Sequence, residues 1–199
     1  MRVVIIGAGP AGVSVVETLR QYDRQTEIVM VTDEPYAPYS PPAMVEYFGT
    51  GRPVHFWRGQ DFPERMDLDY RSGIRVRDVL PGEGAVRLED GRTLAYDRLV
   101  IATGGRLYAP LEGAEKPGVY NFKSLTAAEE LLGRVRGGQG KTALIVGAGF
   151  IGVEIALLLA DLGVQVIQMV RSRVMRSMLD PETSDLVLGM LRARGVDVV

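Results

Sequence analysis

The sequence predicts an α/β protein that contains two copies of one parallel strand–turn–helix–strand unit. Residues 3–13 read VVIIGAGPAGV and residues 143–153 read ALIVGAGFIGV, so an apolar strand and a glycine-rich turn occur twice. In each copy, apolar residues at helical spacing follow the turn, and a β-branched run follows the helix. This order is that of a βαβ unit. Residues 85–96, in the middle of the chain, alternate apolar and polar residues, which predicts a small antiparallel insertion.

The first copy begins at the N-terminus. Residues 3–6 are an apolar run that predicts the first strand, and the glycine turn follows directly. The spacing of Val13, Val16 and Leu19 predicts a helix with one buried face. The β-branched run 28–32 predicts the second strand.

The second copy extends further than the first. Its helix is expected to end at Gly163, and residues 164–170 predict the next strand. Asp180 followed by proline is typical of a helix start, so a further helix is predicted over 181–194. Residues 196–199 predict a last strand.

The middle of the chain gives weaker signals. Residues 51–71 are polar and predict no defined element, whereas 73–79 and 98–102 predict strands. Residues 85–96 alternate around an Asp-Gly pair at 90–91, which is a strong hairpin signal.

Proline and glycine cluster between residues 109 and 118, which predicts a domain boundary. We therefore expect an N-terminal domain over 1–113 and a second domain over 114–199.

Composition excludes several classes of function. The net charge of the 199-residue chain is −2 and no basic run is present, so nucleic acid is not expected as a partner. The chain has no cysteine and one histidine, which excludes disulfides, thiolate metal sites and histidine clusters. No apolar run approaches the ~18 residues that a membrane span needs. We expect no membrane span and a cytoplasmic location.

The glycines of each turn have distinct expected roles. Gly7 allows the sharp turn after the strand, Gly9 lets a pyrophosphate approach the main chain, and Gly12 lets helix and strand pack closely. The alternative is a purely structural turn. The expected dinucleotide-binding residues are Gly7, Gly9, Pro10, Ala11 and Gly12 in the first copy, and Gly147, Gly149, Phe150, Ile151 and Gly152 in the second.

The residues after the second strand of each copy indicate which nucleotide is bound. Asp33, or Glu34 beside it, is the expected acceptor for a ribose hydroxyl in the first copy. The second copy has Arg171 and Arg173 there, which favour the 2′-phosphate of NADP over NAD. In both copies the alternative is an ordinary solvated loop, and NAD stays open.

Four motifs in order carry a resemblance to a known family. They are VVIIGAGPAG at the start, YDRLVIATGG over 96–105, PGVYNFKSLTAAEEL over 117–131 and ALIVGAGFIGVEIA over 143–156. Together they resemble the pyridine nucleotide–disulfide oxidoreductases, flavoproteins that bind two dinucleotides. The resemblance covers nearly the whole chain.

The resemblance implies a Rossmann-like FAD-binding domain with a small β-hairpin or meander insertion, followed by an incomplete Rossmann-like NAD(P)-binding domain. It places FAD on the first turn, with Thr103 and Gly104 close to it. It makes Phe150 an aromatic gate over the flavin and sets Glu154 near the nicotinamide. The alternative for Phe150 is a plain core aromatic residue.

Two departures from the family refine the expected reaction. The stretch 39–43 reads YSPPA where disulfide-reducing members carry cysteines, so electrons are expected to pass from the flavin to another acceptor, a small redox protein or a small molecule. Val45 stands where reductases of ferredoxin-like acceptors usually carry a lysine that pairs with the glutamate matching Glu154. Any role of Glu154 that depends on this pair is therefore in question.

Family members continue for about as long again, so the resemblance implies a fragment or a truncated chain, which could form a homo-oligomer or pair with the remainder. A dinucleotide-binding module without turnover is a second hypothesis. A third assigns nicotinamide cofactors to both units, which the motif at 103–104 disfavours. The single histidine, His55, is a weak candidate for a proton donor.

Overall fold

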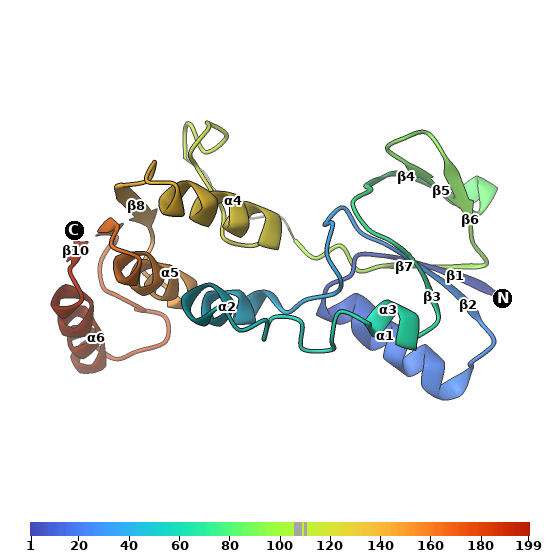
Figure 1. Cartoon of the computed structure of the whole chain (residues 1–199), viewed down its shortest axis with the longest axis horizontal. Coiled ribbons are helices and arrows are strands. Elements are labelled where there is room, and N and C mark those ends of the chain that lie inside the picture. The colour runs from blue at the N-terminus through green and yellow to red at the C-terminus, as the bar shows by residue number, and fades with distance from the viewer. Residues whose placement is uncertain (106–108, 110) are drawn as a thin grey trace. The chain divides into compact units, whose positions relative to one another are not determined.

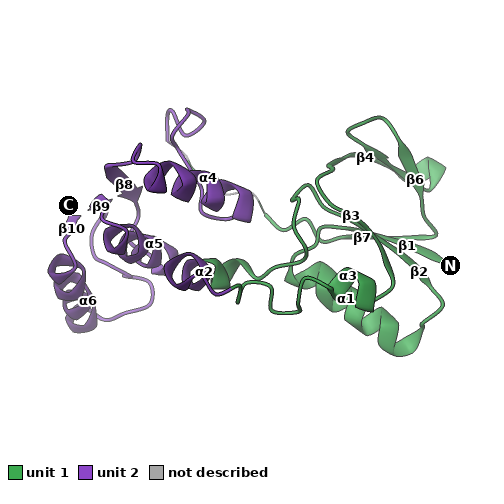
Figure 2. Ribbon diagram, viewed as in Figure 1, with its two compact units in different colours: residues 1–44, 53–110 green, residues 45–52, 111–199 purple. Residues whose placement is uncertain are grey.

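The computed structural model describes residues 1–105, 109 and 111–199, and the chain forms two compact units (Figure 2). The first comprises Met1–Met44 and Pro53–Pro110, and the second comprises Val45–Arg52 and Leu111–Val199. The second unit thus includes a short segment from the first half of the sequence. The domains 1–113 and 114–199 stay a prediction.

The first unit is built on a parallel sheet with the strand order β3-β2-β1-β7. In the central strand, Val4 lies opposite Val29 on one side and Leu99 on the other. The elements of this layer are β1 (Arg2–Ile6), α1 (Pro10–Tyr22), β2 (Glu27–Val31), β3 (Leu68–Arg71) and β7 (Arg98–Ile101).

Both faces of this sheet are covered, which explains why β1 and β2 are continuous apolar runs rather than alternating ones. α1 and α3 (Phe62–Arg65) cover one face, and an antiparallel sheet of β4 (Val76–Leu80), β5 (Ala85–Leu88) and β6 (Thr93–Ala95) covers the other (Figure 1). The first core contains Val3, Ile5, Val13, Val16, Ile28, Met30 and Phe62. The second contains Val4, Ile6, Val29, Val31, Val86, Leu88 and Leu94.

The polar stretch without a sequence prediction contains α3 and β3, and α2 (Met44–Thr50) lies just before it. Two single-turn 3₁₀ helices are also present, η1 (Pro41–Ala43) and η2 (Pro81–Glu83). β3 pairs in parallel with β2, a neighbour distant in sequence. Such short elements are stabilised by tertiary contacts, as the complete burial of Phe62 shows.

The second unit contains a three-stranded parallel sheet with the order β10-β9-β8. Ser124 caps the helix that begins at Leu125, because the Ser124 hydroxyl accepts a hydrogen bond of 3.2 Å from the Ala127 N–H. The carboxylate of Asp180 caps the last helix in the same way through Thr183, at 2.8 Å. The elements are α4 (Leu125–Arg136), β8 (Thr142–Val146), α5 (Phe150–Asp161), β9 (Gln165–Met169), α6 (Pro181–Ala193) and β10 (Val196–Val198).

One face of this second sheet is open. Leu144, Val146 and Met169 are 57%, 55% and 45% exposed, and the register places them on the same side of β8 and β9. On the opposite side, Val166 and Gln168 are fully buried. None of the helices in the described parts of the chain is long and apolar enough to cross a membrane.

Candidate dinucleotide-binding sites

The two glycine turns have the same backbone conformation. Gly7 has φ +107° and Gly147 has φ +105°, in the region that favours glycine. The residues before the two helices also match, with ψ −177° at Gly9 and −175° at Gly149. The sequence repeat is therefore a structural repeat.

Each turn packs too closely against its helix to accept a side chain at the third glycine. A Cβ at Gly12 would lie 2.1 Å from the carbonyl oxygen of Gly7, and a Cβ at Gly152 would lie 2.4 Å from that of Gly147. These contacts bring the first turn of each helix against the end of its strand, as the sequence predicts.

The middle glycine of each turn faces open space. A Cβ at Gly9 or Gly149 would meet no atom within 4 Å. No side chain caps either helix, so the free N–H groups of each first turn point to this space together with the positive end of the helix dipole. α1 starts at Pro10, which has no N–H, whereas α5 starts at Phe150. We call this open space and the N–H groups around it the glycine cradle of each unit, and each cradle is a candidate site for an anion such as a pyrophosphate.

The first glycine of each turn is bonded to the neighbouring strand. The N–H of Gly7 donates to the carbonyl of Val31 at 2.8 Å, and that of Gly147 donates to Met169 at 2.9 Å. Counting onward from these strand ends, Asp33 and Arg171 occupy equivalent positions. The two copies therefore carry opposite charges at one place of the fold.

Both acidic candidates of the first unit have partners. The Asp33 carboxylate accepts a hydrogen bond of 2.8 Å from Nη2 of Arg75. The Glu34 carboxylate accepts one of 3.0 Å from the hydroxyl of Tyr39. Asp33 is exposed and Glu34 is partly buried, so Asp33 is the more accessible of the two to a ribose.

The two arginines of the second unit have different surroundings. Arg171 is exposed. Arg173 is partly buried, and its Nη2 donates to the carbonyls of Arg176 at 3.2 Å and Leu179 at 2.8 Å. Arg173 therefore holds its own loop together, and Arg171 presents its charge to solvent.

Thr103 and Gly104 follow β7, the strand beside β1. The N–H of Ala102 donates to the carbonyl of Ile6 at 2.8 Å, and a Cβ at Gly7 would lie 2.3 Å from the carbonyl oxygen of Ala102. Thr103 and Gly104 are exposed just beyond this contact. The structure brings this motif next to the first glycine turn.

Phe150 and Ile151 open α5 and are 51% and 62% exposed. Phe150 is thus not a core residue. Glu154 lies one helical turn further and is partly buried. Burial raises the pKa of its carboxyl, and no residue in the described ranges forms an ion pair or side-chain hydrogen bond with it.

Sequence reasoning did not single out two residues near the turns. Arg75 reaches Asp33 because the N–H of the preceding residue, Ile74, donates to the carbonyl of Thr32 at 3.0 Å. The two segments are distant in sequence, so no local sequence pattern indicates this contact. Gln168 did leave a signal, a polar residue inside the apolar strand QVIQM.

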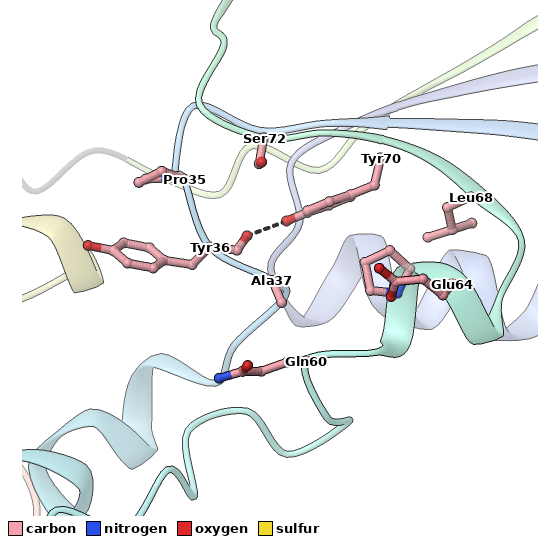
Figure 3. A pocket seen from close by; sticks show the side chains of 9 residues that line it. Pro35, Tyr36, Ala37, Gln60, Glu64, Leu68, Tyr70 and Ser72 are labelled. Carbon is pink, nitrogen blue, oxygen red and sulfur yellow. Dashed lines mark hydrogen bonds between the residues drawn. The ribbon is translucent and has the colours of Figure 1, made fainter.

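A separate pocket of about 380 Å³ opens beside β3 and α3 in the first unit (Figure 3). The hydroxyl of Tyr70 donates to the carbonyl of Tyr36 at 2.6 Å across it, and burial raises the pKa of Tyr70. None of the predicted site residues lines it. The lining residues are Pro35, Tyr36, Ala37, Gln60, Pro63, Glu64, Leu68, Tyr70 and Ser72.

His55 belongs to the interior of the first unit. Its side chain is 1% exposed, and its ring lies 4.0 Å from that of Phe56. Its carbonyl accepts a hydrogen bond of 2.8 Å from the N–H of Ser40. This environment suits a core residue better than a proton donor.

Comparison with curated proteins yields oxidoreductases. The chain is 31% identical to an NADH oxidase of Methanocaldococcus jannaschii, over 100% of this chain and 47% of that protein. It is 29% identical to a rubredoxin-NAD(+) reductase of Pseudomonas putida, over 98% of this chain and 52% of that protein. The chain thus spans about half the length of these relatives.

Solved structures share the whole fold. A NAD-dependent persulfide reductase from A. fulgidus matches with a TM-score of 0.86 and 31% identity, over 100% of this chain and 39% of that one. Putidaredoxin reductase, in a covalent complex with putidaredoxin, matches with a TM-score of 0.82 and 28% identity, over 100% of this chain and 49% of that one. Residues 1–199 match one family throughout, and the chain belongs to the pyridine nucleotide-disulphide oxidoreductase family.

Proposed function

We propose that this chain forms the dinucleotide-binding part of a FAD-dependent NAD(P)H oxidoreductase that passes electrons to an acceptor other than a disulfide. The observation that carries the proposal is the pair of matched glycine cradles with opposite charges at equivalent strand ends. Bound FAD and NAD(P)H would supply the redox chemistry, a hydride transfer from nicotinamide to flavin.

In the first unit, the turn at Gly7–Gly12 would hold the FAD pyrophosphate through main-chain N–H groups. Asp33 would accept a hydrogen bond from the ribose, with Glu34 as the alternative. Thr103 and Gly104 would contact the cofactor from the end of β7. Exposure of Asp33 and the open space at Gly9 support these roles.

In the second unit, the turn at Gly147–Gly152 would hold the nicotinamide nucleotide. The exposed guanidinium of Arg171 suits a 2′-phosphate, which favours NADPH, whereas Arg173 would act by shaping the loop. Phe150 would gate access to the flavin, and its 51% exposure leaves it free for that role. Glu154 would lie near the nicotinamide.

The acceptor is proposed as a small redox protein or a small molecule. The absence of cysteine from the chain supports this, because disulfide exchange needs a thiolate. Putidaredoxin, which was solved in a complex with a relative of this chain, is an example of a protein partner for a reductase of this fold. A cytoplasmic location belongs to the same proposal, as does either a homo-oligomer or pairing with the remainder of the protein.

A dinucleotide-binding module without turnover is the second candidate. The observation that favours it is the open apolar face formed by Leu144, Val146 and Met169, since an incompletely covered sheet suits a part of a larger assembly.

The test is an anaerobic absorption titration. We expect the purified chain to bind FAD with a flavin spectrum, and NADPH to bleach it at lower concentration than NADH. Gly9→Val should abolish FAD binding and Gly149→Val should abolish bleaching while FAD stays bound, because each side chain would fill one cradle. A colourless chain that binds ADP-ribose would favour the module, and a chain that binds neither nucleotide would refute both candidates.

A further inference from the structure

The two βαβ units differ at one buried position. In the first unit Met30 lies opposite Ile5, and in the second unit Gln168 takes the corresponding place opposite Ile145. Met30 packs in an apolar cluster, as expected for the centre of a covered strand. Gln168 is just as buried, at 0% exposure, but carries an amide.

The Gln168 amide contacts the glycine turn. Its Nε2 lies 3.2 Å from the carbonyl oxygen of Gly147 and donates a hydrogen bond to it. The orientation of the amide follows from chemistry, because a carbonyl can only accept. The Oε1 of Gln168 is buried as well, and no hydrogen bond to it forms within the described part of the chain. A buried amide oxygen without a hydrogen bond costs free energy of folding, a cost that the methionine at the equivalent position of the first unit does not carry.

A second hydrogen bond holds the next peptide of the same turn. The main-chain N–H of Met175 donates to the carbonyl of Ala148 at 2.7 Å. Met175 has φ +49°, an uncommon value for a residue with a side chain. The loop is anchored at Val174, which is 3% exposed and whose carbonyl accepts 2.7 Å from the Ser184 hydroxyl.

These two contacts fix the direction of two N–H groups. In a trans peptide the C=O and the following N–H point in opposite directions. Holding the Gly147 carbonyl therefore sets the N–H of Ala148, and holding the Ala148 carbonyl sets the N–H of Gly149. In the first turn, no residue that the structure describes donates a hydrogen bond to the carbonyl of Gly7 or Ala8.

We propose that Gln168 is a positioning residue which, together with the Met175 N–H, holds the second glycine turn in its anion-binding shape before the nucleotide arrives. The inference rests on the proposed function, in which this turn receives the nicotinamide nucleotide. A site that is ordered in advance loses less entropy on binding. This suits a nucleotide that binds and leaves in every reaction cycle, whereas a resident cofactor can order its own site.

The test compares Gln168→Met, which copies the first unit, with Ile167→Val as a control in the same strand. We expect Gln168→Met to weaken NADPH binding about tenfold, or ~1.4 kcal/mol, with FAD binding unchanged. Thermal unfolding should stay at the wild-type temperature or rise, since the unpaired buried amide is gone. Amide hydrogen exchange in 147–150 should become faster, while exchange in 7–10 should not change.

The outcomes separate this inference from the proposed function. Unchanged NADPH affinity and unchanged exchange in Gln168→Met would overturn the positioning role. A lower unfolding temperature with a proportionate loss of both nucleotides would show a merely structural residue and overturn it too. If wild-type chain binds no NADPH, the proposed function fails, and the exchange comparison alone decides whether Gln168 orders the turn.

Discussion

The pKa of the Glu154 carboxyl is set by its environment in the folded chain and not by the residues beside it in the sequence. Burial raises its pKa, and the described residues supply no cation to offset this. A raised pKa in the folded state means that the folded chain holds the proton more tightly than the unfolded chain. Stability is therefore lost as pH rises from the ordinary value of 4.5 through the folded-state pKa.

We predict that Glu154→Gln removes this loss, so that the variant is more stable than wild type above that pH window and equal to it below. Urea unfolding at a series of pH values checks this. Parallel curves for Glu154→Gln and wild type would contradict the prediction.

Among single residues, the sequence predicts the conformation of the glycine turn well and the contacts of the charged residues only in part. The turn at Gly7 and the close packing at Gly12 follow from a motif whose geometry is local, whereas pyrophosphate binding at Gly9 stays a prediction. The pairing of Asp33 with Arg75, and the use of Arg173 within its own loop, depend on where distant or folded-back segments meet. Sequence spacing contains no information on these contacts.

At the level of elements, α4 depends on its capping residue. The helix has no acidic residue in its first turn to interact with the dipole, and the Ser124 hydroxyl satisfies the N–H of Ala127. The sequence did not predict this helix as an element of its own.

We predict that Ser124→Ala lowers the stability of the second unit by about 1 kcal/mol, the usual effect of losing such a cap. Ser124→Asp should preserve stability, because a carboxylate accepts the same hydrogen bond. Denaturant unfolding followed by circular dichroism measures both. Equal losses for the two variants would indicate that packing, and not capping, is the function of this side chain.

Elements with strong periodicity or clear punctuation were predicted within a few residues, as with α6 after Asp180 and the β5–β6 hairpin around Asp90. The short elements α3 and β3 were not predicted. β3 exists because its backbone pairs with β2, and α3 exists because Phe62 fills the core beneath α1. Both causes are non-local.

At the scale of the whole molecule, each unit has its own parallel sheet and its own glycine cradle. We predict that each nucleotide protects one unit. FAD should slow hydrogen exchange in β1 and α1, and NADPH should slow it in β8 and α5. At a hundredfold excess of nucleotide over Kd, the free energy of the opening that permits exchange should rise by up to ~2.7 kcal/mol.

Mass spectrometry of deuterated peptides measures this protection. Gly149→Val is the control, and it should remove the effect of NADPH while keeping that of FAD. Protection by FAD in the second unit beyond the first turn of α5, where Phe150 is proposed to lie near the flavin, would contradict independent binding.

The sequence by itself determined the duplicated βαβ units, their glycine turns and the family, because these depend on local conformation and on ordered motifs. It also shows that these 199 residues contain no cysteine, which needs only a count. Tertiary structure alone decided that residues 45–52 belong with the second unit, that Arg75 meets Asp33, and that a buried Gln168 supports one turn while Met30 underlies the other. These features arise where packing brings distant segments together, and packing is a property of the folded chain.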